Sequence, residues 1–215
     1  MGTSQHDGPV PQELRSLCDE VSACVLCELS KSRTVAVPGD GPPDAEIMIV
    51  GEAPGFHEDQ QGRPFVGPAG HFLDDLLASI QVARRSVYIT NVVKCRPPGN
   101  RDPRPEEAAA CKPYLDRQIN LIRPKLVVTL GRYSMARYFG DAVSISRIHG
   151  QPKRVNGMVV LPIFHPAAAL HQPKYRAAIE EDFLKIPKLI AEAQRWSVEN
   201  APAERNDDAE QLTMF

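Results

Sequence analysis

GEAPGFHEDQQGRPFVGPAG, residues 51–70, is the stretch that decides the fold of this chain. The apolar run IMIV at residues 47–50 precedes it, and apolar pairs at 72–73 and 76–77 follow it at helical spacing. Strand, long turn and helix in this order form the setting in which α/β enzymes bind ligands, beyond the carboxyl ends of parallel strands. We therefore expect a ligand site in this turn.

Two acidic residues and one isolated aromatic residue stand out in the turn: Glu52, Glu58 and Phe65. A phenylalanine in a connecting loop contributes little unless its ring covers something. In an arbitrary sequence, a surface loop whose Phe65 caps the core would be the favoured interpretation. Features later in the chain favour a site.

The rest of the chain alternates apolar runs with helical patterns, which predicts an α/β fold of three layers, α/β/α, around a central four-stranded parallel sheet. Residues 12–196 are expected to form one domain, between a flexible N-terminus at 1–11 and a disordered tail at 197–215. Pro187 should kink or split the last helix. Strands are expected at 47–50, 87–93, 126–130 and 158–164, and helices at 12–29, 69–80, 105–122, 133–139 and 174–196.

Composition describes an ordinary globular protein, expected to be a monomer, with 42% hydrophobic residues and a net charge of −2. No apolar run reaches membrane-spanning length, and the start lacks the blocks of a signal peptide, so a cytoplasmic location is expected. Residues 84–154 carry 15 Lys/Arg and 5 Asp/Glu, whereas the rest carries 10 and 22. A solvated basic face would explain this block, but a polyanionic partner explains it better beside a candidate site.

Five cysteines in a chain without a signal peptide argue against a disulfide framework. Cys24 and Cys27 form a CxxC pair, Cys95 and Cys111 follow, and Cys18 is left over. The CxxC pair alone could be redox-active, half of a zinc site, or a chance occurrence.

Two further polar residues lie at strand ends. Asn91 stands within an apolar strand, where its amide is costly unless a partner with a donor and an acceptor satisfies it. His165 ends the last strand and precedes a proline; a lone histidine is more often a satisfied core or surface residue. Because the carboxyl ends of parallel strands share one edge of a sheet, Glu52, Asn91 and His165 should face one pocket.

In the residues named above and in four longer blocks around them, the sequence strongly resembles the family 4 uracil-DNA glycosylases, the iron–sulfur branch of the uracil-DNA glycosylase superfamily. The resemblance covers about residues 15–190 and includes the four cysteines. The matching blocks are GEAPG (51–55), GRPFVGPAG (62–70), VYITNVVKCRPPGNR (87–101) and LPIFHPA (161–167).

The resemblance implies an enzyme that flips uracil out of DNA and hydrolyses its N-glycosidic bond in base excision repair. Phe65 would stack on the base, and Asn91 would pair with its O4 and N3–H. His165 would bind O2 and stabilise the leaving anion. Glu52 would orient water or stabilise the cationic sugar.

The resemblance also implies supporting roles around the pocket. Backbone amides near Ala53 would contact the base, and Glu58 would line the pocket and guard against the methyl group of thymine. Leu170 would wedge into the DNA, although the run after His165 is less bulky than in the family. The DNA substrate would be the polyanionic partner. His149 receives no role.

The four cysteines would hold a structural [4Fe–4S] cluster, although four thiolates also suit structural zinc. The cluster would fix the loop between Cys95 and Cys111, which is expected to carry basic residues towards the phosphates. These are Lys94, Arg96, Arg101 and Arg104. The main alternative is an iron–sulfur DNA-binding relative without hydrolase activity, and a redox carrier is more remote.

The C-terminal residues QLTMF, 211–215, resemble the pentapeptide by which bacterial repair proteins bind the sliding clamp. Gln211, Leu212 and Phe215 would be the contacting residues, with Met214 in place of leucine. A polar tail that happens to end in apolar residues would look the same, because matches of five residues are common by chance.

Overall fold

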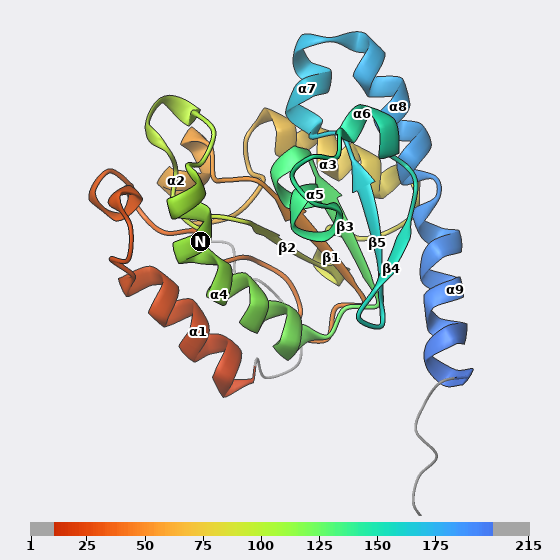
Figure 1. Ribbon diagram of the computed structural model, residues 1–215, viewed down its shortest axis with the longest axis horizontal. Coiled ribbons are helices and arrows are strands. Elements are labelled where there is room, and N and C mark those ends of the chain that lie inside the picture. The colour runs from red at the N-terminus through yellow and green to blue at the C-terminus, as the bar shows by residue number, and fades with distance from the viewer. Residues whose placement is uncertain (1–10, 200–215) are drawn as a thin grey trace, which may run out of the picture.

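The computed structural model describes residues 11–199 and builds them around one central sheet (Figure 1). Within these residues the sheet has five strands in the order β2-β1-β3-β5-β4. Four are parallel: β1 (Ile47–Gly51), β2 (Val87–Asn91), β3 (Leu126–Leu130) and β5 (Met158–Ile163). The fifth, β4 (Lys153–Val155), is antiparallel to β5.

Helices cover both faces of the sheet, as the three-layer prediction requires (Figure 1). The long helices are α1 (Gln12–Ala23), α3 (Pro68–Ser79), α4 (Pro105–Ile122), α5 (Arg132–Phe139), α8 (Pro173–Phe183) and α9 (Ile186–Glu199). Shorter helices are α2 (Phe56–Gln61), α6 (Ile145–Ile148) and α7 (Pro166–His171), with 3₁₀ turns at Glu28–Lys31, Arg84–Ser86 and Pro98–Asn100.

Alternation along the strands divides the core into two clusters, because successive side chains point to opposite faces of a sheet. In β1, Ile47 and Ile49 face the cluster that contains α3, α8 and α9. Met48 and Val50 face the opposite cluster, which contains α1 and α4. All four parallel strands are buried along nearly their whole length, so their sequences read as continuous apolar runs.

The prediction of a four-stranded sheet is wrong by one strand. Strand β4 is short and mostly exposed, with polar Lys153 and Arg154, so it carries no apolar pattern. An Asn156-Gly157 turn joins it to β5, and both turn residues have positive φ, 49° and 80°. Asn-Gly with positive φ at both positions is the favoured two-residue hairpin turn. The Asn156-Gly157 turn, and not an apolar pattern, is therefore the feature of the sequence that indicates this strand.

Two helix boundaries also differ from the prediction. Helix α1 ends at Ala23, not at residue 29, because Cys24 adopts an extended conformation (φ −62°, ψ 136°). The predicted last helix divides into α8 and α9, with Pro187 as the second residue of α9, where proline is tolerated. The predicted break at Pro187 is thus confirmed.

The predicted termini remain largely untested. Helix α9 continues to Glu199, past the predicted end of the domain at residue 196. Residues 1–10 and 200–215, which include the predicted clamp-binding tip, lie outside the described part of the chain. In the part that is described, no helix combines the length and apolar character that a membrane span needs.

Candidate active site

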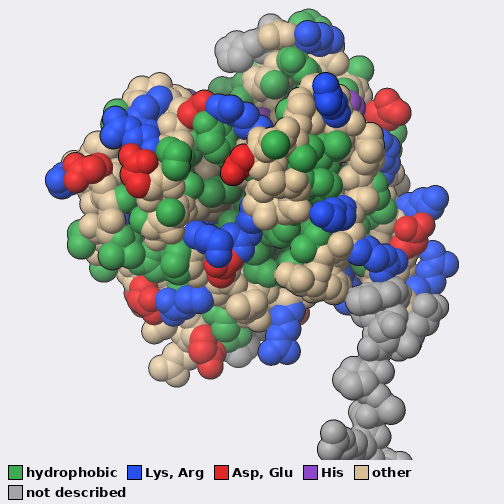
Figure 2. Space-filling view, viewed as in Figure 1, with side chains coloured by type: hydrophobic (Ala, Val, Ile, Leu, Met, Phe, Trp, Pro, Cys, Tyr) green, Lys and Arg blue, Asp and Glu red, His purple; other side chains and the backbone are tan. Residues whose placement is uncertain are grey.

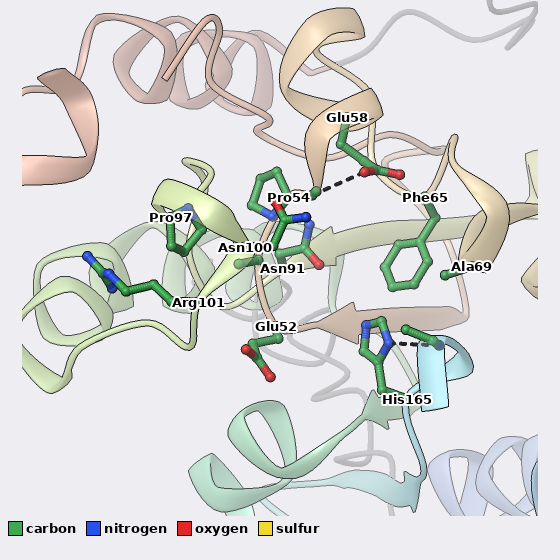
Figure 3. Close-up of a pocket in the computed structure, with 13 residues that line it drawn as sticks. Glu52, Pro54, Glu58, Phe65, Ala69, Asn91, Pro97, Asn100, Arg101 and His165 are labelled. Atoms are coloured by element: carbon green, nitrogen blue, oxygen red, sulfur yellow. Dashed lines mark hydrogen bonds between the residues drawn. The ribbon is translucent and has the colours of Figure 1, made fainter. Parts of the chain in front are cut away.

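The carboxyl ends of β1, β2 and β5 open into one cavity of about 360 Å³. Six of the seven residues predicted to act on the substrate line it, and Figure 3 shows Phe65, Asn91 and His165 arranged around one space. The seventh, Leu170, lies on α7 with 45% of its surface exposed. The cavity is lined by Glu52, Ala53, Pro54, Gly55, Glu58, Phe65, Ala69, Asn91, Pro97, Asn100, Arg101, His165 and Ala167.

Asn91 is the last residue of β2 and pairs in register with Gly51 of β1. It is only 1% exposed, yet its Oδ1 has no hydrogen-bond partner within residues 11–199. A side chain on Gly51 would place Cβ 2.4 Å from that oxygen and 2.7 Å from Cζ of Phe65. Buried polar atoms are normally satisfied, so Asn91 Oδ1 points to a ligand that donates a hydrogen bond.

Phe65 adopts an unusual backbone conformation, with φ at +51°. This region is strained for a bulky residue and persists only where the surroundings enforce it. The ring is 6% exposed and stacks against His165 with centroids 5.6 Å apart. Behind it, a Cβ on Gly70 would lie 2.0 Å from the Phe65 carbonyl oxygen, so only glycine fits there.

Glu58 holds the loop that carries Phe65. Its Oε1 accepts hydrogen bonds from the N–H groups of Val66 and Gly67 at 2.8 and 2.9 Å, and its Oε2 accepts one from Gly55 at 3.1 Å. Arg84 supports the same loop, because its guanidinium donates to the Pro64 carbonyl at 2.7 Å. Glu58 therefore lines the cavity, as predicted, while its carboxylate is engaged with the backbone.

His165 caps the N-terminus of α7, and the Ala167 N–H donates to its Nδ1 at 3.1 Å. An Nδ1 that accepts a hydrogen bond carries no proton. Burial lowers the pKa of His165 to about 4, so its ring is neutral at pH 7. The remaining proton is then on Nε2, which makes His165 a neutral donor in the cavity.

Glu52 follows β1 and has an unusually weak acid group. Burial, and to a smaller extent the charge of Asp102, raises the pKa of its carboxyl to about 7, while Arg132 acts in the opposite direction. At neutral pH, Glu52 therefore exists in both the acid and the carboxylate form, as expected of an acid or base in an active site.

Comparison with known proteins identifies the family. Residues 38–185 match the family described as "Uracil DNA glycosylase superfamily". The chain belongs to this superfamily.

Its similar relatives include several type-4 uracil-DNA glycosylases. The one from Sulfurisphaera tokodaii is 48% identical over 195 residues, which cover 86% of this chain and 89% of the relative. Those from Archaeoglobus fulgidus and Thermotoga maritima are 46% and 43% identical and cover 85% and 83% of this chain, and 96% of each relative. The predicted family is confirmed, and the predicted function, uracil excision by a hydrolase of DNA repair, is confirmed at the level of the family.

The superfamily substrate is DNA, but one predicted phosphate contact is wrong. Lys94 is 1% exposed and its Nζ donates to Thr90 Oγ1, the Asn91 carbonyl and Gln118 Oε1 at 2.6, 2.8 and 2.7 Å. A buried lysine in this network cannot reach a phosphate. Its effect is to fix the backbone of Asn91.

The other predicted basic contacts lie nearer the surface. Arg101 forms a bidentate ion pair with Glu107 at the start of α4, and Arg104 is exposed. On the face seen in Figure 2, Lys and Arg side chains are scattered among Asp and Glu and do not form one continuous patch.

Pro97 and Asn100 also line the cavity, although neither is among the predicted site residues.

The four predicted cysteine ligands line one small second cavity between α1, α4 and the end of β2. Arg33 donates to Cys95 Sγ at 3.1 Å, and the Lys94 N–H donates to Cys111 Sγ at 3.4 Å. Four thiol donors with charged and amide donors facing them suit an iron–sulfur cluster. As the described side chains stand, no three His, Cys, Asp or Glu residues are arranged to hold a metal ion.

The weak acidity of Glu52 predicts a pH-dependent stability. Its native pKa of about 7 lies above the ordinary 4.5, so the native state binds more protons between these values than the unfolded state. Stability from this group is therefore present at low pH and lost as pH rises towards 7. Relative to Glu52→Gln, the parent should lose unfolding free energy between pH 5 and pH 8, as measured by urea unfolding. Identical pH dependence in both proteins would contradict the burial of this carboxyl.

Proposed function

We propose that the protein removes uracil from DNA by binding the flipped base in the cavity formed by Phe65, Asn91 and His165. The observation that carries the proposal is the buried, unsatisfied Oδ1 of Asn91. Uracil presents an N3–H donor beside an O4 acceptor, which an amide matches with one acceptor and one donor. Cytosine presents the reverse pattern and would leave the amide unpaired.

The ring of Phe65 supplies the stacking surface for the base. It is held in a fixed conformation by Glu58, Arg84 and the absence of a side chain at Gly70. A flipped base loses its stacking partners in the duplex, at a cost of a few kcal/mol. Stacking on an aromatic ring returns about 1–3 kcal/mol of it.

Bond breaking needs a donor near O2 and a negative group near the sugar. His165 would donate from Nε2 to O2, where negative charge develops as the N-glycosidic bond breaks. Glu52, in its carboxylate form, would stabilise the cationic sugar or orient the attacking water. Backbone amides near Ala53 would hold the base, and Leu170 on α7 would fill the gap left in the DNA.

The alternative is a DNA-binding relative that has lost hydrolase activity. Glu52, Phe65, Asn91 and His165 are all present around one cavity, which supports the enzyme instead. Release of uracil from labelled DNA by the parent protein would decide between the two.

Asn91→Asp tests the base-binding role. A carboxylate cannot donate to O4, so single-turnover release of uracil should fall by about ten- to 100-fold, the usual effect of an unsatisfied buried group. Release of cytosine from single-stranded DNA should rise relative to uracil. Asn120→Asp, an exposed position on α4 with the same change of charge, is the control and should behave as the parent. If Asn91→Asp releases uracil and cytosine at the same rates as the parent, Asn91 does not bind the base.

We further propose that Cys24, Cys27, Cys95 and Cys111 bind a structural [4Fe–4S] cluster. Four cysteine thiolates are the usual ligands for such a cluster, which would tie α1 to the loop that follows β2. No step of base excision requires an electron, so the role is structural.

Purified without oxygen, the protein should be brown and contain iron. Cys95→Ser should lose the colour and unfold at lower temperature because one ligand is missing. Cys18→Ser is the matched control, since Cys18 is not among the residues that line the cysteine cavity, and it should keep both colour and iron. A colourless parent that contains zinc and excises uracil would contradict the cluster but not the enzyme.

We also propose that the protein acts in the cytoplasm as a monomer and binds the bacterial sliding clamp through Gln211, Leu212 and Phe215. Binding to the clamp would raise the local concentration of the enzyme at newly copied DNA. Deleting residues 211–215 should abolish co-elution with the clamp and leave uracil release from short oligonucleotides unchanged. Deleting residues 206–210 instead keeps the tip and should preserve co-elution. If the intact protein does not bind the clamp at micromolar concentrations of clamp, the C-terminal residues are not a clamp-binding segment.

A further inference from the structure

Phe56 is an exposed aromatic residue that follows directly on the lining of the active-site cavity. It begins α2 and stands between Gly55 and Glu58, both of which line the cavity. Its side chain lies outside the hydrophobic clusters of the described residues, and 52% of its surface is exposed. The fold therefore does not need this ring for its core.

Neighbouring side chains nevertheless fix the ring in place. The guanidinium of Arg96 lies over it, 5.1 Å from the centroid, and His57 meets it edge-on at 5.5 Å. Arg96 is itself anchored, because its Nε donates to Asn100 Oδ1 at 2.7 Å. Asn100 lines the cavity from the loop after β2 (Figure 3), so the loops after β1 and β2 together hold the ring at the mouth of the pocket.

A flat, half-exposed ring beside a cation matches the chemistry of a nucleobase joined to a phosphate. Aromatic rings stack on any base, because every base has a π-face, and arginine adds attraction to the phosphate. Once uracil occupies the cavity, the adjacent nucleotide of the same strand must lie near the rim. If the base of this nucleotide is unpaired, it is free to stack on Phe56. If the base is paired, it stays stacked in the duplex.

We infer that Phe56 and Arg96 form a binding subsite for the unpaired base next to uracil in single-stranded DNA. The inference rests on the proposed function, since it places the neighbour of a base bound between Phe65 and Asn91. The enzyme should therefore have a lower KM for single-stranded than for double-stranded DNA that contains uracil.

The test compares Phe56→Leu, which keeps an apolar side chain without a π-face, with Phe56→Trp, which keeps the π-face. On a single-stranded oligonucleotide with one uracil, Phe56→Leu should raise KM by about 5- to 100-fold, the range that base–aromatic stacking contributes. Its kcat should stay near the parent value, because the cavity is untouched. Phe56→Trp should retain a KM close to the parent, and the KM for a uracil–adenine duplex should change less in both variants.

Leu184→Ala, at an exposed apolar position between α8 and α9, is the control and should match the parent on both substrates. Thermal unfolding of Phe56→Leu should also match the parent, which separates stacking from a folding defect. An unchanged KM of Phe56→Leu on single strands, or an equal rise on the duplex, would overturn the subsite while excision by the parent stands. A parent without uracil release would instead overturn the proposed function.

Discussion

The carboxylate of Glu58 is the constraint on which the cavity at the strand ends depends. It accepts three backbone N–H groups from Gly55, Val66 and Gly67, so it joins the two ends of the long turn after β1. Hydrogen bonds to a charged group contribute about 1.5–3 kcal/mol each, which exceeds in sum the strain of about 1–3 kcal/mol at a residue such as Phe65 with positive φ. Together with Arg84 and Gly70, this carboxylate holds the ring beside His165.

A buried lysine connects the two cavities. The Nζ of Lys94 donates to the Asn91 carbonyl, while its backbone N–H donates to Cys111 Sγ. The cavity at the strand ends and the cysteine cavity thus share one five-residue stretch, from Asn91 to Cys95. The proposed cluster would position Asn91 through this stretch without any electron transfer.

The elements that were predictable are those whose sequence carries a local signal. Four strands read as apolar runs because both faces of the sheet are covered, and Asn91 and His165 stood out as polar residues at strand ends. Strand β4 and the short helices α2, α6 and α7 carry too little apolar periodicity to be predicted from the sequence. The prediction groups Lys94 with the basic residues that follow it, since no local pattern reveals that Gln118, 24 residues away, accepts a hydrogen bond from its Nζ.

Burial acts in opposite directions on the two titratable groups of the site. It raises the pKa of Glu52 to about 7 and lowers that of His165 to about 4, because in each case it disfavours the charged form. At neutral pH, His165 therefore adds no charge to the cavity, and Glu52 is only partly ionised. In the proposed reaction, charge develops as the N-glycosidic bond breaks, and the donor on His165 and the carboxylate form of Glu52 would then face opposite ends of the charge separation. Such a site would be matched to the transition state more closely than to the bound base.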